Sequence, residues 1–135
     1  MKQEFIELAK YRLEKARNTL SDARQYLQGA TMESTVNRIY YALFYAVNAL
    51  LITKGLSSSK HSGVRSLFNK EFVSKGLIDK QLGKFYTEMF DTRQAGDYKD
   101  FVSFKKEDVE VWLSQAEQFI GKVQEETMKI IKEDE

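Results

Sequence analysis

The chain contains no cysteine, no proline and only one histidine among its 135 residues. Without cysteine it can form neither disulfides nor zinc–thiolate sites, and it has no thiolate nucleophile. One histidine is too few for the multi-histidine spacings of metalloenzymes, so we expect no metal site and no cofactor. Gly-rich phosphate loops and the Gly-x-Ser-x-Gly elbow of hydrolases are missing too, which excludes the common enzyme classes built on them.

The chain also has little net charge. Lys+Arg total 21 against 20 for Asp+Glu, which gives a formal net charge of +1 at pH 7. The molecule as a whole therefore has no electrostatic preference for nucleic acid or for an anionic membrane, and binding of either kind requires a local patch. We expect neither DNA nor a membrane as a partner. Acidic side chains within residues 1–7, where an export signal needs an apolar stretch, favour a cytoplasmic location.

One long apolar run stands out against this background. Residues 36–52 are almost entirely apolar, yet they include Arg38, two asparagines and three tyrosines. Because a charged side chain in a bilayer is costly, we interpret the run as a buried helix of a folded core rather than a membrane span. A guanidinium in such a helix must be paired or must face a polar cleft. The sequence therefore predicts a helical bundle built around a polar cleft.

Apolar residues at helical spacing account for the first half of the chain. With no proline, the helix ends have to come from glycines, and Gly29, Gly55 and Gly76 are the expected stop signals. Before Gly29, apolar residues recur at intervals of three and four, which indicates one face of a long helix. A second helix, capped by Thr31 or Ser34, is expected to extend through the apolar run.

The second half predicts a loop and three further helical segments. Residues 55–63 are rich in serine and have the composition of a loop. A short helix should follow, then a helix capped by Asp79 that breaks at Gly96, and a last helix capped by Ser103. No segment alternates with period two, so we predict an all-α chain. The content of 42% hydrophobic and 13% aromatic residues is enough for one core, and we expect one domain over residues 1–135.

Three residues of the apolar run are candidates for ligand binding. Arg38 is either a buried staple, bonded to a carboxylate or to helix carbonyls, or an anion ligand whose forked donors suit phosphate. Tyr41 and Tyr45 lie one and two turns further along the same side of the predicted helix. They are either core aromatics whose hydroxyls reach the rim or stacking platforms for a base.

A second group of candidates lies near the end of the fourth predicted helix. Arg93 follows the apolar face of that helix and should point inward or toward a cleft. Asp97 and Tyr98 come directly after Gly96, where an acid, a phenol and the guanidinium can converge. Alternatively, Asp97 simply pairs with Arg93 and holds the turn. His61 is expected to be an exposed residue of the serine-rich loop, but as the only histidine it is also a candidate for proton transfer.

Four segments together resemble the small stand-alone HEPN-domain proteins of bacteria and archaea. They occur in the same order and at matching spacing over nearly the whole chain, at residues 37–45, 60–64, 72–77 and 93–98. The resemblance implies a bundle of four to five helices, with two long helices packed antiparallel, and a homodimer with a cleft between its subunits. Many such proteins are metal-independent ribonucleases, including toxins restrained by a minimal nucleotidyltransferase encoded beside them. RNA or a nucleotide is the implied ligand.

The HEPN resemblance also bears on the catalytic residues. The catalytic motif of the family is an arginine followed after a short interval by a histidine, often with a tyrosine close behind. Arg93 matches the arginine and Tyr98 matches the tyrosine, but Asp97 or Tyr98 stands where the histidine is expected. His61 is the remaining proton carrier if it reaches the cleft. Three hypotheses remain: a toxin-type ribonuclease, a noncatalytic module that binds a nucleotide or docks onto the nucleotidyltransferase, or a purely structural interaction protein in which both arginines are internal staples.

Overall fold

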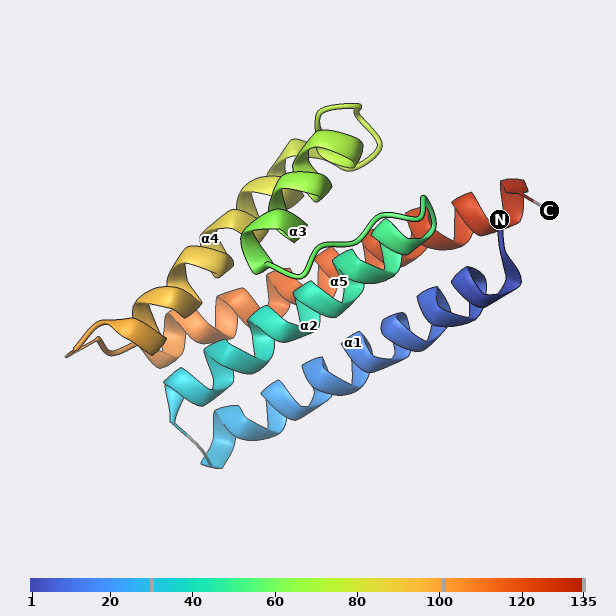
Figure 1. Cartoon of the computed structure of the whole chain (residues 1–135). Helices are drawn as coiled ribbons and strands as arrows, with labels where there is room; N and C mark the ends of the chain where they lie inside the picture. The colour runs from blue at the N-terminus through green and yellow to red at the C-terminus, as the bar shows by residue number, and fades with distance from the viewer. Residues whose placement is uncertain (30, 101, 135) are drawn as a thin grey trace.

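The described residues form five α-helices and one π-helical turn, an all-α fold as predicted. A computed structural model describes residues 1–29, 31–100 and 102–134, and no strand occurs within these ranges. The elements, in chain order, are α1 (Gln3–Gly29), α2 (Met32–Ile52), α3 (His61–Phe68), η1 (Asn69–Val73), α4 (Lys80–Tyr98) and α5 (Lys106–Asp134). Helices α1 and α2 form a long antiparallel pair, α5 runs beside α2, and α3 and α4 cover the remaining side of α2 (Figure 1).

Helix α2 is the centre of the bundle, because it packs against α1, α3, α4 and α5. Twelve of its 21 residues are buried, and they cover more than half of the helix circumference, while the remaining side, with Arg38, Tyr41 and Tyr45, is half-buried. This burial explains why the sequence of α2 is apolar almost throughout. The interpretation of residues 36–52 as a core helix is confirmed. None of the helices in the described residues combines the length and hydrophobicity needed to cross a membrane.

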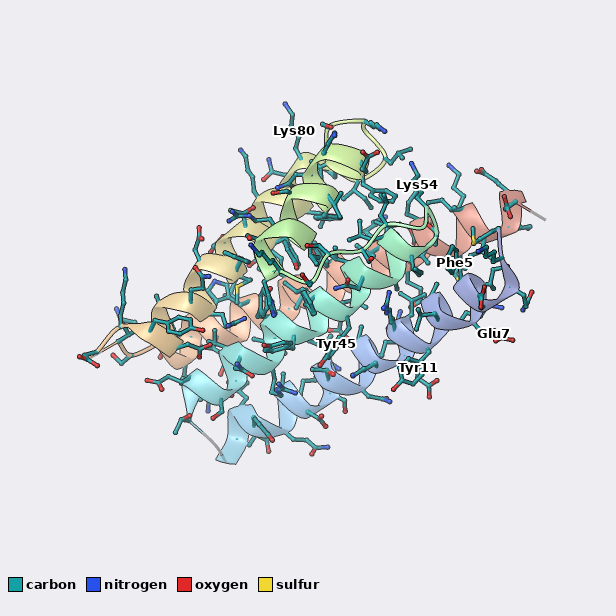
Figure 2. All side chains as sticks on the ribbon, viewed as in Figure 1. Phe5, Glu7, Tyr11, Tyr45, Lys54 and Lys80 are labelled. Carbon is teal, nitrogen blue, oxygen red and sulfur yellow. The ribbon has the colours of Figure 1, made fainter. Side chains whose placement is uncertain are left out.

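The long outer helix α1 shows the predicted amphipathic pattern. Its buried residues recur every three or four positions, while Glu7 and Tyr11 project from the opposite face (Figure 2). The Thr31 hydroxyl accepts a hydrogen bond from the Ser34 amide at 3.2 Å and so caps α2. Gly55 and Gly76 have positive φ angles of 69° and 77°, consistent with their predicted role in ending helices.

Two predicted boundaries in the second half are wrong. The loop after α2 ends before His61, which is the first residue of α3 rather than a loop residue. Helix α4 does not break at Gly96 but continues to Tyr98. A Cβ atom at Gly96 would lie 3.0 Å from the Phe104 ring, so this glycine allows a close approach between α4 and the following segment. The sequence does not distinguish this use of glycine from a helix stop.

The start of the last helix also differs from the prediction. Helix α5 begins at Lys106, and the Lys105 carbonyl accepts the hydrogen bond of the Val109 amide. Ser103 is therefore too far upstream to cap it. Asp79 does cap α4, since its carboxylate accepts a hydrogen bond from the Gln81 amide at 2.9 Å. Helix α4, which carries Arg93, therefore starts as predicted and is longer than predicted only at its C-terminal end.

Candidate functional site

Tyr40 lies at the centre of a polar cluster formed by α2, α3 and α4. Its side chain is fully buried. Its hydroxyl is 2.7 Å from Nδ1 of His61, the first residue of α3. The chain reverses direction between these two residues, and the short loop after α2 brings the start of α3 back against the middle of α2 (Figure 1).

The His61 ring is packed among aromatic side chains of α2. It stacks on Phe44 with a centroid distance of 4.4 Å and an interplanar angle of 17°. It also meets the Tyr41 ring edge-on at 5.7 Å. His61 is half-buried, so the expectation that it is an exposed loop residue is wrong. Stacking and the hydrogen bond to Tyr40 together hold the imidazole in one orientation.

Arg93 reaches the same tyrosines from α4. Its side chain is only 11% exposed, as expected for an inward-pointing residue. The guanidinium carbon lies 4.9 Å from the centre of the Tyr40 ring and 5.4 Å from that of Tyr41. Arg93 Nε donates to Asp97 Oδ2 at 2.9 Å, which is the pairing that the sequence left as one alternative. We call Tyr40, Tyr41, His61, Arg93 and Asp97 the Arg93 cluster.

The protonation states in the Arg93 cluster follow from burial and from the arginine charge. Burial lowers the pKa of His61, and the positive charge of Arg93 lowers it further, so the imidazole is neutral at pH 7. Burial also lowers the pKa of Arg93, but its hydrogen bond to Asp97 and the neighbouring tyrosines outweigh this, and the net shift is upward. Burial raises the pKa of Tyr40 despite opposing contributions from Tyr86 and Arg93. The cluster therefore combines one fixed cation with a neutral imidazole.

Tyr86 borders the Arg93 cluster, with its ring centre 6.1 Å from that of Tyr40, although sequence reasoning missed it. It is fully buried in α4, and its hydroxyl has no hydrogen-bond partner among the described residues. Burial raises its pKa well above the ordinary value, and so does the adjacent Tyr40 hydroxyl. The signal was its spacing in the sequence. Tyr86, Phe90 and Arg93 lie four and three residues apart, which puts Tyr86 on the face of α4 that carries Arg93.

Arg38 and Tyr45 extend the Arg93 cluster along α2. The Arg38 guanidinium lies 5.3 Å from the centre of the Tyr41 ring, so Arg38 and Arg93 both contact this tyrosine. Its Nη2 donates to Asn37 Oδ1 at 3.0 Å, and no carboxylate within the described ranges pairs with it. Tyr45 is next to Tyr41, with ring centres 6.0 Å apart, and Lys15 Nζ lies 4.5 Å from its ring centre. Cations and aromatic rings therefore alternate along this side of the molecule.

The structure does not bring Tyr98 to the Arg93 cluster. Its side chain is 77% exposed. Because α4 continues unbroken to this residue, positions 93 and 98 lie on different faces of the helix. Tyr98 instead lines a separate shallow hollow with Asp91, Gln94 and Lys99. Of the four residues predicted to take part in catalysis, Arg93, Asp97 and His61 come together, whereas Tyr98 points elsewhere.

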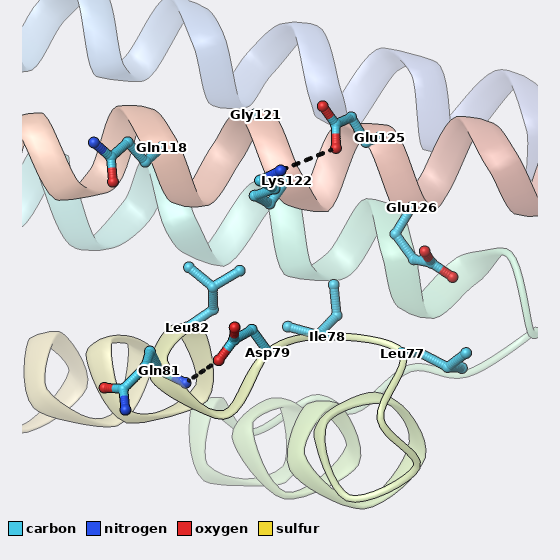
Figure 3. Close-up of a pocket in the computed structure, with 10 residues that line it drawn as sticks. All are labelled: Leu77, Ile78, Asp79, Gln81, Leu82, Gln118, Gly121, Lys122, Glu125 and Glu126. Atoms are coloured by element: carbon cyan, nitrogen blue, oxygen red, sulfur yellow. Dashed lines mark hydrogen bonds and ion pairs between the residues drawn. The ribbon is translucent and has the colours of Figure 1, made fainter.

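The surface has one hollow that adjoins the predicted site residues and a larger one that does not. One of about 310 Å³ lies beside Arg38 and Asp97 and is lined by Tyr26, Glu33, Ser34 and Asn37 as well. The other, of about 570 Å³, lies between residues 77–82 and helix α5 (Figure 3). Three carboxylates and one lysine line this larger hollow, but it contains no predicted site residue. The smaller hollow therefore continues the Arg93 cluster, and the larger one is unconnected with it.

The fold is an all-α bundle in which an arginine and a histidine contact the same two tyrosines. Comparisons with known proteins agree with the HEPN resemblance. The model of the HEPN domain family matches residues 9–126, and the chain belongs to this family. A "UPF0332 protein" of Thermotoga maritima is 50% identical over 91% of both chains. A "Putative toxin" of Methanocaldococcus jannaschii is 36% identical over 82% of this chain and 75% of its own. Another "Putative toxin" of that organism is 31% identical over 88% of both chains.

Proposed function

We propose that this chain is a HEPN protein of the toxin–antitoxin type that binds RNA at the Arg93 cluster and cleaves it without a metal ion. Membership of the HEPN family and the names of the two Methanocaldococcus jannaschii relatives support the toxin assignment. The observation that carries the ribonuclease assignment is the common contact of Arg93 and His61 with Tyr40. It puts the one histidine of the chain within reach of the motif arginine.

The chemistry of RNA cleavage matches this pair of side chains. Attack of the ribose 2′-hydroxyl on the adjacent phosphate forms a 2′,3′-cyclic phosphate and breaks the bond to the 5′-oxygen, and the 2′ proton passes through solvent to that leaving oxygen. The attack builds negative charge on the phosphorane oxygens, and a fixed cation stabilises that charge. Because Asp97 engages only Nε of Arg93, both terminal nitrogens of its guanidinium are available to the phosphate. His61 contributes a ring nitrogen, Nε2, that has no hydrogen-bond partner in the described part of the chain.

The flanking residues supply what single-stranded RNA needs next to the reacting phosphate. Tyr41 and Tyr45 offer half-buried rings that suit stacking with bases. Arg38 and Lys15 lie against these rings, where each can contact a neighbouring phosphate. In a homodimer that brings two such surfaces together, the cleft would hold one RNA strand between two Arg93 clusters. RNA binding is compatible with the balanced overall charge of the chain, because the cations that would contact phosphate are gathered on this one surface.

A cleavage assay with matched variants tests this function. Purified cellular RNA, including transfer RNA, is incubated in EDTA with the wild type, with Arg93→Ala and with Arg65→Ala. Arg65 is the matched control, since its guanidinium also packs on an aromatic ring, Phe90, and pairs with Asp91, but outside the cluster. We expect cleavage by the wild type and by Arg65→Ala, and its loss in Arg93→Ala. Equal cleavage by all three proteins would contradict the role of Arg93.

A second candidate function is a noncatalytic module that binds a nucleotide or docks onto a minimal nucleotidyltransferase. The observation that favours it is Asp97, which stands near the place of the motif histidine and pairs with Arg93. A carboxylate there neutralises part of the charge that a phosphorane would require. Absence of cleavage at high protein concentration, with RNA or nucleotide binding that Arg93→Ala abolishes, would favour this alternative.

A further inference from the structure

We infer that Tyr40 is a positioning residue that holds His61 in the tautomer with its proton on Nε2, so that His61 acts beside Arg93 as a hydrogen-bond donor to phosphate. The contact between His61 and phosphate rests on the proposed function, whereas the tautomer of His61 does not.

The Tyr40 hydroxyl determines the direction of its hydrogen bond with His61. Tyr40 is fully buried, and Nδ1 of His61 is the one hydrogen-bond partner of its hydroxyl within the described ranges. The buried Tyr86 hydroxyl nearby forms no hydrogen bond in those ranges and so offers no second acceptor. A buried donor without an acceptor is rarer in proteins than an under-used acceptor.

The Tyr40 proton is then directed to His61. Nδ1 of His61 lies 2.7 Å from Tyr40 Oη. If Nδ1 carried the proton, it would donate to Tyr40, and the buried Tyr40 hydroxyl proton would be left without an acceptor. A neutral imidazole has one proton, so an accepting Nδ1 places that proton on Nε2.

The surroundings of His61 agree with a neutral ring that donates from Nε2. From α2 it faces Tyr40, Tyr41 and Phe44, and from α4 the charged group near it is Arg93. A cation next to the imidazole opposes a second proton on the ring. With Nε2 protonated, His61 cannot accept a proton there, but it can donate a hydrogen bond to the same phosphate that Arg93 binds. His61 is then an anion ligand rather than the base of the reaction.

Nitrogen NMR of the imidazole tests the tautomer directly, because the chain has a single histidine and every imidazole signal belongs to His61. We expect the wild type at pH 8 to show the Nε2-protonated tautomer alone. Tyr40→Phe should move the spectrum toward the mixture of an exposed histidine. Tyr86→Phe is the matched control, since it removes the neighbouring buried hydroxyl and should leave the Nε2-protonated tautomer in place. A wild-type spectrum of the Nδ1-protonated form, or a Tyr40→Phe spectrum equal to wild type, would overturn the inference.

The phosphate contact is tested in the same spectra. Inorganic phosphate added to the wild type should shift the Nε2 signal, and Arg93→Ala should remove this response while Arg65→Ala keeps it. No response to phosphate in the wild type would overturn the assignment of His61 as an anion ligand, even if the tautomer is as expected. RNA cleavage does not enter these measurements, so a failure of the ribonuclease proposal and a failure of this inference give different results.

Discussion

The guanidinium of Arg93 lies against the face of the Tyr40 ring, with 4.9 Å between its central carbon and the ring centre. This contact connects α4 with α2. A guanidinium that packs flat on an aromatic ring keeps its nitrogen donors at its edge, where they remain available to an anion. One edge position is occupied by Asp97. Under the proposed function, Asp97 and an incoming phosphate would compete for this guanidinium.

Removing the Asp97 carboxylate should strengthen RNA binding. Asp97→Asn weakens the hydrogen bond to Nε of Arg93 and removes one negative charge from the cluster. The pair is partly exposed, with side chains 11% and 38% accessible, so its contribution to stability is small. We expect the Kd for RNA to fall by up to about fivefold, the factor that ~1 kcal/mol represents. Fluorescence anisotropy with a labelled single-stranded RNA at fixed salt measures the change.

Asp91→Asn is the control for Asp97→Asn. It makes the same chemical change at another carboxylate of α4, one that pairs with Arg65. It should alter RNA affinity less than Asp97→Asn does. Weaker binding by Asp97→Asn would show that the carboxylate orients Arg93 or contacts the RNA itself.

The lowered pKa of His61 predicts a loss of stability in mild acid. In the unfolded chain the imidazole titrates at its ordinary pKa of 6.5, whereas in the folded protein it titrates at lower pH. Between these two values the unfolded state binds more protons, so the free energy of unfolding decreases as pH falls from about 6.5. Thermal unfolding between pH 7.5 and 5.5 should show that Tm decreases as the pH is lowered. Most carboxylates do not yet titrate in this range.

His61→Gln isolates this effect. The variant keeps an acceptor for the Tyr40 hydroxyl but has no titrating ring, so its Tm should depend less on pH than that of the wild type. Parallel Tm curves for the two proteins across this range would contradict the lowered pKa.

Gly121 in the middle of α5 should be replaceable with a gain in stability. A Cβ atom at this position would meet nothing within 4 Å. Glycine costs up to ~1 kcal/mol relative to alanine inside a helix, because it loses more backbone freedom on folding. Gly121→Ala should therefore raise the free energy of unfolding by roughly 0.5–1 kcal/mol. Urea denaturation measures this increase.

Gly96→Ala provides the contrast within α4. Its Cβ would lie 3.0 Å from the Phe104 ring, so the gain in backbone entropy is opposed by a steric contact. We expect less stabilisation than at Gly121, or a loss. An equal gain at both positions would mean that the Phe104 ring moves aside without cost.

Much of the fold was predictable from local pattern. The spacing of apolar residues identified the long helices. Asp79 was identified as a cap by its side chain and position, and Thr31 was one of two candidates for the cap of α2. The errors at His61 and Gly96 share one cause. Serine and glycine favour loops when considered locally, but at these positions packing against α2 and against Phe104 extends the helices.

The candidate site was predictable only in part. The sequence singled out Arg93, Asp97 and His61 because their residue types are unusual where they occur. It could not show that His61 contacts Tyr40 or that Tyr98 points away. Both depend on how α3 and α4 are placed around α2, and residues distant in sequence meet only after the helices pack.

The sequence by itself determined the helical pattern, the family and the identity of the polar groups, since these depend on residue type and spacing along one chain. Only the tertiary structure decided which polar groups share a site. Tyr40 received its role in this way: in the sequence it is one apolar-face tyrosine among several, whereas in the folded bundle its hydroxyl meets His61 and its ring meets Arg93. Such contacts between helices follow from packing geometry and leave no periodic signal in the sequence.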